Sequence, residues 1–202
     1  MSAMSPTPSS ALSTSSAADP AWAELYEEIA DCPRCPLART RSRTVPGVGP
    51  AHADIMFIGE APGAREDESG VPFVGPAGQF LDELLAGIGL TRAAVYIANV
   101  VKCRPPANRD PEPSEIDACA PYLDRQIATV DPKVVVTLGR FSMARWFPGQ
   151  TISRIHGQPK HVDGRVVVPM YHPAAALHNG SLRSVIAADF ARLPEFIAEV
   201  RS

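Results

Sequence analysis

Four short apolar runs, separated by helical patterns, constrain the fold of this chain most strongly. Each run is apolar almost throughout instead of alternating, which is typical of strands that are covered on both faces, as in a parallel sheet. The segments between the runs carry apolar residues at helical spacing. This alternation predicts an α/β layered domain. The runs are residues 55–58, 95–98, 134–138 and 166–170.

Five segments show the helical spacing of apolar residues that this layered arrangement requires. The last of them extends from about Ser184 to the C-terminus, and we expect Pro194 to bend it. The other four cover residues 22–29, 80–88, 116–127 and 141–147.

The length and composition suit one domain of ordinary size. With 202 residues, of which 45% are hydrophobic, the chain can bury one good core, which we assign to residues 21–202. Residues 1–20 are mostly Ser, Ala, Thr and Pro, so we expect a disordered tail that lacks the apolar stretch of a signal peptide. No apolar run is long enough to span a bilayer. We therefore expect a cytoplasmic monomer with no membrane partner.

The net charge of -3 argues against a protein that coats nucleic acid by bulk electrostatic attraction. Any contact with DNA must use a local basic patch, although ordinary solvated surface charges are the alternative for each basic residue. The candidates flank the cysteines in the sequence and are Arg39, Arg41, Arg43, Lys102, Arg104 and Arg109.

Four cysteines combine one tight pair with two distant single residues. Cys32 and Cys35 are separated by two residues, and Cys103 and Cys119 follow much later. This pattern indicates a metal or iron-sulfur site, although inert buried cysteines, a redox dithiol or a zinc half-site are alternatives. Disulfides are less favoured because no secretory signal precedes the chain. The spacing does not decide between zinc and iron-sulfur, since both accept four thiolates.

Polar residues follow the predicted strands directly. Glu60 comes after the first run, Asn99 after the second, Arg140 after the third and His172 after the fourth. In open parallel sheets, ligands bind at the carboxyl ends of the strands. We therefore expect an acid, an amide and an imidazole to meet at one edge of the sheet.

A set of motifs in chain order carries a resemblance to a known family. The motifs are Gly59-Glu60-Ala61-Pro62-Gly63, Gly70-Val71-Pro72-Phe73-Val74-Gly75-Pro76-Ala77-Gly78, Asn99-Val100-Val101-Lys102-Cys103-Arg104-Pro105-Pro106 and His172-Pro173. Together with the cysteines they resemble family 4 uracil-DNA glycosylases over roughly residues 22–200. The resemblance implies a three-layer α/β/α sandwich around a four-stranded parallel sheet. It also implies a 4Fe-4S cluster on Cys32, Cys35, Cys103 and Cys119.

The activity that the resemblance implies is base excision repair of uracil in single- or double-stranded DNA. Such an enzyme flips uracil out of the DNA and hydrolyses its N-glycosidic bond, which leaves an abasic site. An Asn99 amide matches uracil O4 and N3–H, and Phe73 can stack on the base. Gly59, Ala61 and Gly63 are expected to line the same pocket. A turn residue and ordinary core packing are the structural alternatives for Asn99 and Phe73.

Four residues are candidates for the chemical step. By resemblance, His172 donates a hydrogen bond to uracil O2 and stabilises the anionic leaving group, with help from backbone N–H groups at Glu60 and Ala61. Glu60 is the leading candidate for positioning the attacking water. Distant relatives place an Asp where this chain has Ala61, so that role cannot be transferred to position 61. Glu66 and Asp67 are therefore the alternative candidates.

Residues 173–179 match the loop that related enzymes press into the minor groove, where an apolar wedge can hold the duplex open. Leu177 is the expected wedge. His178, Asn179 and Arg183, together with Arg104, are the expected contacts to the DNA backbone, with plain surface roles as the alternative.

Two rival functions remain open. The first is the cluster-bearing relative that traps uracil covalently through a histidine in an inserted loop. That insert is absent, and we interpret His156 as a surface or DNA-facing residue. The second is a non-catalytic iron-sulfur or zinc module that binds nucleic acid, which would leave Glu60, Asn99 and His172 unexplained.

Overall fold

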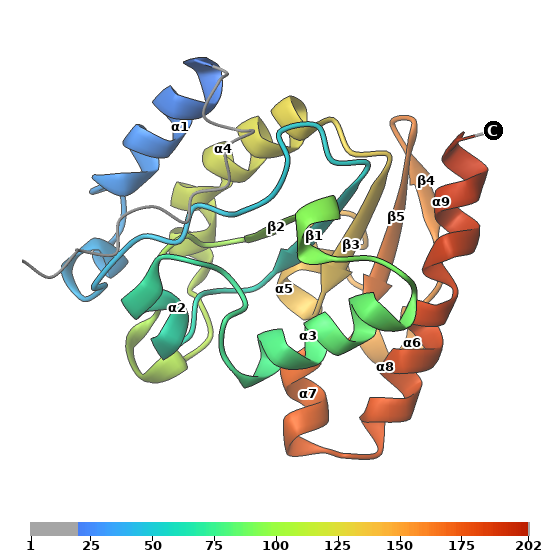
Figure 1. Ribbon diagram of the computed structural model, residues 1–202. Helices are drawn as coiled ribbons and strands as arrows, with labels where there is room; N and C mark the ends of the chain where they lie inside the picture. The colour runs from blue at the N-terminus through green and yellow to red at the C-terminus, as the bar shows by residue number, and fades with distance from the viewer. Residues whose placement is uncertain (1–19, 202) are drawn as a thin grey trace, which may run out of the picture.

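A mostly parallel five-stranded sheet forms the centre of the computed structural model, which describes residues 20–201 (Figure 1). The strand order is β2-β1-β3-β5-β4. The four parallel strands coincide with the four predicted runs and are β1 (Ile55–Gly59), β2 (Tyr96–Asn99), β3 (Val134–Leu138) and β5 (Arg165–Met170). The predicted disordered tail, residues 1–20, lies outside the described residues except for Pro20, which begins the first helix.

The predicted count of four strands was wrong by one edge strand. Strand β4 (Lys160–Val162) pairs antiparallel with β5 through a tight turn at Asp163 and Gly164. Both turn residues have positive φ, which glycine adopts without strain and Asp tolerates. The strand is short and mostly exposed, so it carries no apolar run that a sequence pattern could reveal.

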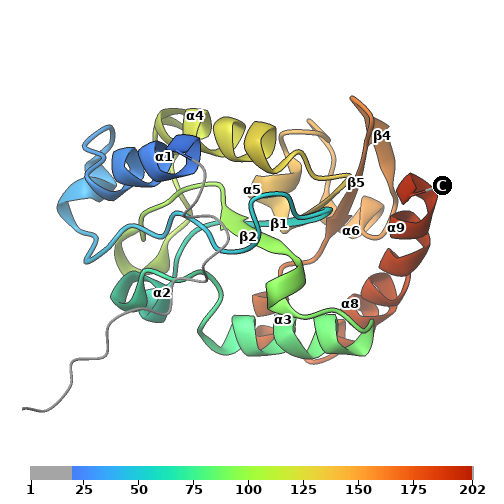
Figure 2. The same ribbon diagram turned by 45° about the horizontal axis from the view of Figure 1, so that its top comes forward.

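Helices cover both faces of the sheet, which confirms the three-layer arrangement (Figure 2). One face is covered by α1 (Pro20–Ala30) and α4 (Pro113–Val130). The other is covered by α3 (Pro76–Gly87), α8 (Leu182–Ala191) and α9 (Leu193–Arg201).

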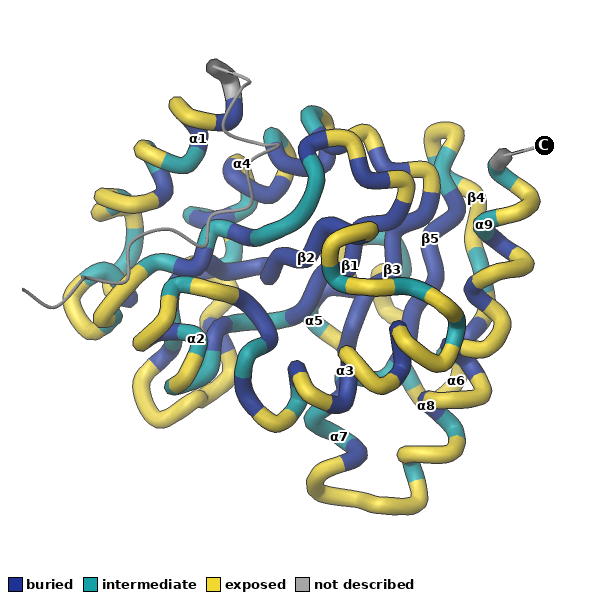
Figure 3. Tube along the Cα trace, in the orientation of Figure 1, coloured by how far each residue is buried: buried dark blue, intermediate teal, exposed yellow. Residues whose placement is uncertain are grey.

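Alternate residues of each strand contribute to two separate hydrophobic cores. On β1, Met56 and Ile58 pack with Trp22 on one face, whereas Phe57 stacks on Phe190 on the other, with ring centroids 5.9 Å apart. The central strands are buried throughout (Figure 3). This double burial explains why the strands read as unbroken apolar runs.

Two predicted helices differ in the structure. The helix expected over residues 141–147 is only one turn, α5 (Arg140–Met143). The last helix is divided into α8 and α9, and the division precedes Pro194, which lies in the first turn of α9 where its missing N–H costs nothing. The remaining short helices are α2 (Ala64–Ser69), α6 (Ile152–Ile155), α7 (Pro173–His178), η1 (Pro36–Arg39), η2 (Arg92–Ala94) and η3 (Pro106–Asn108).

None of the helices within residues 20–201 combines the length and the apolar character that a bilayer crossing demands.

Candidate active site

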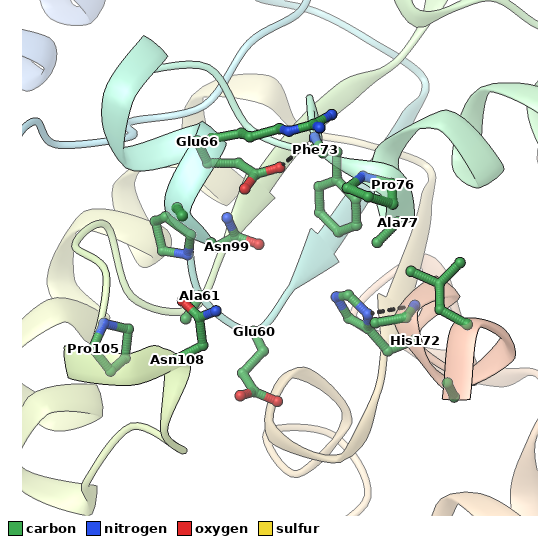
Figure 4. Close-up of a pocket in the computed structure, with 18 of the residues that line it drawn as sticks. Glu60, Ala61, Glu66, Phe73, Pro76, Ala77, Asn99, Pro105, Asn108 and His172 are labelled. Atoms are coloured by element: carbon green, nitrogen blue, oxygen red, sulfur yellow. Dashed lines mark hydrogen bonds between the residues drawn. The ribbon is translucent and has the colours of Figure 1, made fainter. Parts of the chain in front are cut away.

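A cavity of about 860 Å³ opens at the carboxyl ends of β1, β2 and β5. Figure 4 shows Asn99, Phe73 and His172 around one space, with Glu60 lower in the view. These residues are far apart in the sequence, and parallel strands bring them together because their ends share one edge. The predicted site residues that line the cavity are Glu60, Ala61, Gly63, Glu66, Phe73, Asn99, His172, Leu177 and His178.

Asn99 ends β2 and turns its side chain into the cavity. Asn99 is only 2% exposed, and its Oδ1 atom is buried without a hydrogen-bond partner among the described residues. Gly59 pairs with Asn99 in the sheet register. A Cβ atom on residue 59 would lie 2.4 Å from Asn99 Oδ1 and 2.7 Å from Phe73 Cζ. Gly59 is not among the residues that line the cavity, but its lack of a side chain lets Asn99 and Phe73 pack against the end of β1.

Phe73 is held in a strained backbone conformation. Its φ of 54° is unusual for a residue with a bulky side chain, and such strain persists only where the surroundings enforce it. Arg92 supplies part of that enforcement, because its guanidinium donates to Phe73 O at 2.9 Å and to Pro72 O at 2.6 Å. Gly78 makes room for this conformation, because a Cβ atom on residue 78 would lie 1.7 Å from Phe73 O. The Phe73 ring stacks on the His172 ring, with centroids 5.4 Å apart.

His172 is the N-cap of α7, and this position determines which ring nitrogen carries the proton. Its Nδ1 atom accepts a hydrogen bond from Ala174 N at 3.1 Å, so the proton of the neutral ring resides on Nε2. Burial lowers the pKa of His172 to about 4, whereas the charge of Glu66 acts in the opposite direction. The imidazole is therefore neutral at physiological pH, and Nε2–H is available as a donor in the cavity (Figure 4).

Glu60 follows β1 and is partly buried at the cavity wall. Burial raises the pKa of Glu60, and repulsion from Asp110 raises it further, whereas Arg140 lowers it. Asp110 and Arg140 form an ion pair at the rim of the same cavity. The sequence pattern did not single out Asp110, because it lies outside every motif and reaches the cavity only through the fold.

Glu66 also lines the cavity, but its carboxylate is engaged with the backbone. Its Oε1 atom accepts from Val74 N at 2.9 Å and from Gly75 N at 2.8 Å, which holds the loop next to Phe73. Asp67 does not lie at the cavity. It is buried, and both of its carboxylate oxygens accept from Ser42 N, so it anchors the preceding loop and cannot position water.

The predicted DNA-facing residues Leu177 and His178 lie on α7, whereas Asn179 follows that helix and Arg183 lies on α8. Leu177 is 49% exposed at the cavity edge, which is unusual for a large apolar side chain, and His178 is exposed beside it. Asn179 instead accepts hydrogen bonds from the backbone N and the hydroxyl of Ser181. Arg183 pairs with a glutamate on α3 and lies over an aromatic ring.

The predicted basic patch is not one continuous surface. Arg39 and Arg43 are exposed, but Lys102 is buried at 1% exposure, so its assignment to the surface was wrong. Arg109 is tied to the buried carboxylate of Glu115 at 2.7 Å.

Two further residues of the sequence analysis have contacts that their motifs did not reveal. Arg104 donates to Asn108 Oδ1 at 2.7 Å. His156 is not a free surface residue, because its Nδ1 atom lies 2.7 Å from Asp189 Oδ2 and its ring packs on Tyr171.

The four cysteines line a second, small cavity between α1 and α4, and none of them is in a disulfide. Arg41 donates to Cys103 Sγ at 3.3 Å and to Cys32 O at 2.7 Å, so it serves this site and not a DNA surface. Lys102 N donates to Cys119 Sγ at 3.3 Å. Burial raises the pKa of the Cys103 thiol to about 11, with Arg41 opposing the increase. Donors aimed at sulfur suit thiolates, which a bound metal would stabilise.

Within residues 20–201, no three His, Cys, Asp or Glu side chains form a group that could hold one metal ion. Four thiols around a common cavity nevertheless provide the donor set of a four-cysteine zinc or iron-sulfur site.

Comparison with known proteins gives consistent matches over most of the chain. The model of the uracil DNA glycosylase superfamily matches residues 46–195. A type-4 uracil-DNA glycosylase of Sulfurisphaera tokodaii is 47% identical over 182 residues, which cover 85% of this chain and 83% of the relative. One of Archaeoglobus fulgidus is 46% identical over 181 residues, with 85% and 91% covered. A type-5 uracil-DNA glycosylase of Pyrobaculum aerophilum is 29% identical over 185 residues, with 75% and 81% covered.

Proposed function

This chain belongs to the uracil-DNA glycosylase superfamily, and on that premise we propose that its large cavity receives a uracil flipped out of DNA. The chain is a DNA repair enzyme that hydrolyses the N-glycosidic bond of uracil. The observation that carries the assignment of the cavity is that Asn99 lines it while its buried Oδ1 has no hydrogen-bond partner among residues 20–201. A buried acceptor without a donor costs free energy unless a ligand supplies the donor.

Asn99 reads the base. Its Oδ1 accepts the uracil N3–H, and its amide nitrogen donates to uracil O4. Cytosine presents the opposite pattern, so an amide held in one orientation discriminates between the two bases. Phe73 stacks on the extruded ring and compensates for stacking lost from the DNA, and Gly59 leaves room for both contacts.

His172 stabilises the leaving group. As the bond between C1′ of the sugar and N1 of uracil breaks, the electron pair stays with uracil, and negative charge develops on O2. The neutral His172 ring donates its Nε2–H to that oxygen, supported by backbone N–H groups at Glu60 and Ala61. One such donor contributes about 3 to 4 kcal/mol to lowering the barrier.

Glu60 acts on the sugar side. Its carboxylate favours the positive charge on the sugar and orients a water molecule whose oxygen attacks C1′. The proton of that water passes to the carboxylate, and the uracil anion takes a proton from solvent. Glu66 contributes indirectly, because it holds the loop at Val74 and Gly75 and its charge acts on His172.

The exposed part of α7 contacts the DNA. Leu177 enters the duplex as a wedge, and His178, Asn179, Arg183 and Arg104 bind the flanking backbone. The existing partners of Arg183 and Asn179 are surface contacts that DNA can replace at small cost.

We propose that Cys32, Cys35, Cys103 and Cys119 hold a 4Fe-4S cluster. The four cysteines line one cavity, and four thiolates are the donor set of such a cluster, as the resemblance of their spacing to family 4 implies. Bound there, the cluster would cross-link the segment after α1 to α4. Iron content and visible absorbance test this, since a zinc protein is colourless.

Residues 21–202 form one domain in this proposal, and the enzyme acts as a monomer on single- or double-stranded DNA. Its substrate is genomic DNA, so we propose a cytoplasmic location with no membrane partner. Cell fractionation and light scattering test these two points.

The identity of the product tests the function itself. The purified protein is incubated with oligonucleotides that contain one uracil, thymine or hypoxanthine, and the strands are analysed under denaturing conditions. Free uracil and an abasic strand are expected. A protein–DNA adduct that resists denaturation would instead indicate covalent trapping, and binding without any base release would indicate a non-catalytic module.

A further inference from the structure

Lys102 is a buried cation at the junction between the cysteines and the base pocket. Its Nζ atom donates to Asn99 O at 2.7 Å and to Gln126 Oε1 at 2.6 Å. Among residues 20–201 no carboxylate forms an ion pair with it. Lys102 also lies next to the sulfurs of Cys103 and Cys119 at the cysteine cavity. A buried ammonium is costly unless its hydrogen bonds and charge are satisfied, so the contacts of Lys102 must be closely fixed.

The Gln126 amide, whose Oε1 accepts the hydrogen bond from Lys102, is held in a fixed orientation. Its Nε2 atom donates to Pro46 O at 2.7 Å and to Tyr96 OH at 3.0 Å. With both amide hydrogens engaged, Oε1 is the atom left to face Lys102. The Lys102 ammonium is therefore locked between β2 and α4, and it cannot choose another rotamer without leaving buried polar atoms bare.

The two ends of Lys102 contact two different functional groups. Its backbone N donates to Cys119 Sγ, whereas its side chain holds the carbonyl of Asn99. Asn99 is the last residue of β2, and the peptide plane that follows it is held on two sides. Its N–H, on Val100, donates to Gly59 O at 3.0 Å, whereas its carbonyl oxygen accepts from Lys102. Lys102 therefore supplies the restraint on the carbonyl side, which the sheet does not provide.

We propose that Lys102 is a positioning residue that couples the cysteine site to recognition of the base by fixing the backbone of Asn99. The proposal rests on the proposed function, because it assigns Lys102 to the same uracil-reading amide. It concerns how accurately Asn99 is placed, and Lys102 itself touches neither uracil nor the sugar.

The first experiment replaces Lys102 with Met, which has a similar length and no charge. Excision of uracil is measured under single-turnover conditions with protein of verified iron content, and affinity for abasic DNA is measured separately. We expect the excision rate to fall by about 10- to 100-fold, since small misplacements of a binding group have effects of this size. Affinity for abasic DNA should not change, because that ligand has no base for Asn99 to read.

The matched control is Lys133→Met, which removes an exposed lysine that pairs only loosely with Asp131 at 3.5 Å. It should excise uracil like the wild-type protein. Because Lys102→Met can destabilise the fold, Gln126→Leu serves as a second variant. It disturbs the same buried network, through the contacts of Gln126 with Pro46 O, Tyr96 OH and Lys102, but it keeps the donor to Asn99 O. At a temperature at which both variants remain folded, excision should fall much more in Lys102→Met than in Gln126→Leu.

A double-mutant cycle with Asn99→Ala separates positioning from other effects. If Lys102 acts through Asn99, then Lys102→Met should lower excision little further in the Asn99→Ala background. An equal loss from Lys102→Met in the wild-type and Asn99→Ala backgrounds, or an equal loss of excision in Gln126→Leu and Lys102→Met, would overturn the proposal. If the wild-type protein released no uracil, the proposed function would fail instead, which is a different outcome.

Discussion

Asn99 and Gly59 are partners in the sheet register. Because Gly59 has no side chain, the Asn99 amide has room beside the end of β1. A Cβ atom on residue 59 would approach Asn99 Oδ1 to 2.4 Å. The strand ends of β1 and β2 are therefore matched to one another, and the base pocket depends on both.

The variant Gly59→Ala should lose uracil excision while keeping its fold and iron content. The added methyl group would also lie 2.7 Å from Phe73 Cζ, so it forces both the amide and the ring to move. We expect a loss of at least about 100-fold in kcat/KM, because the clash displaces both recognition groups. Gly87→Ala is the control, since no atom lies within 4 Å of a Cβ there. Equal excision by both variants would refute the assignment of the base pocket.

His172 should be neutral, with its proton on Nε2, throughout the physiological range. Because burial lowers its pKa to about 4, below the ordinary value of 6.5, the unfolded chain binds the proton more readily. The contribution of His172 to stability is therefore complete above pH 6.5 and is lost as the pH falls toward 4. Imidazole nitrogen NMR on labelled protein measures both properties. A proton on Nδ1 at pH 7, or titration near pH 6.5, would contradict the hydrogen bond from Ala174.

The acid limb of the pH–rate profile should depend on Asp110. Burial and repulsion from Asp110 raise the pKa of Glu60, and the carboxylate is the active form. Activity should therefore be lost on acidification at a higher pH than for an ordinary glutamate. Asp110→Asn should move that limb to lower pH, because it removes a negative charge and frees Arg140 to face Glu60.

The control for this shift is Asp163→Asn, which changes an exposed turn residue between β4 and β5 to another residue that tolerates positive φ. Its profile should match that of the wild type. An acid limb that stays in place in Asp110→Asn would show that Glu60 does not govern it.

Arg92 should matter for excision although it lies outside the cavity. Its guanidinium holds Pro72 O and Phe73 O, and Phe73 keeps its strained φ only with such support. Arg92→Ala should lower excision by about 10-fold or more, through relaxation of the loop that carries the stacking ring. Asp82→Asn should have little effect, because it removes only the exposed ion pair to Arg92. Similar losses in both variants would indicate a general effect on stability.

The sequence predicted the parts of the fold that depend on double burial. The four parallel strands were readable because both of their faces are covered by helices, so almost every residue in them is apolar. Strand β4 was not readable, since it forms by pairing with β5 and contributes exposed residues. The short α5 was overestimated because apolar residues at helical spacing do not reveal where tertiary contacts end a helix.

The site was predictable to the extent that one geometric rule applies. The carboxyl ends of parallel strands share an edge, so Glu60, Asn99 and His172 were expected to line one cavity, and they do. The supporting residues were not predictable in the same way. Lys102 and Arg92 gain their contacts from segments that only folding brings near, and their side chains alone suggest surface charges.

Asn99 and His172 hold one flipped uracil during bond cleavage in the mechanism proposed above. The most direct measurement is the single-turnover release of free uracil from an oligonucleotide with one uracil, by the wild-type protein, Asn99→Ala and His172→Ala at equal iron content. We predict an abasic strand from the wild type and a fall of about 100-fold or more in each variant. Full excision by both variants would contradict this central claim.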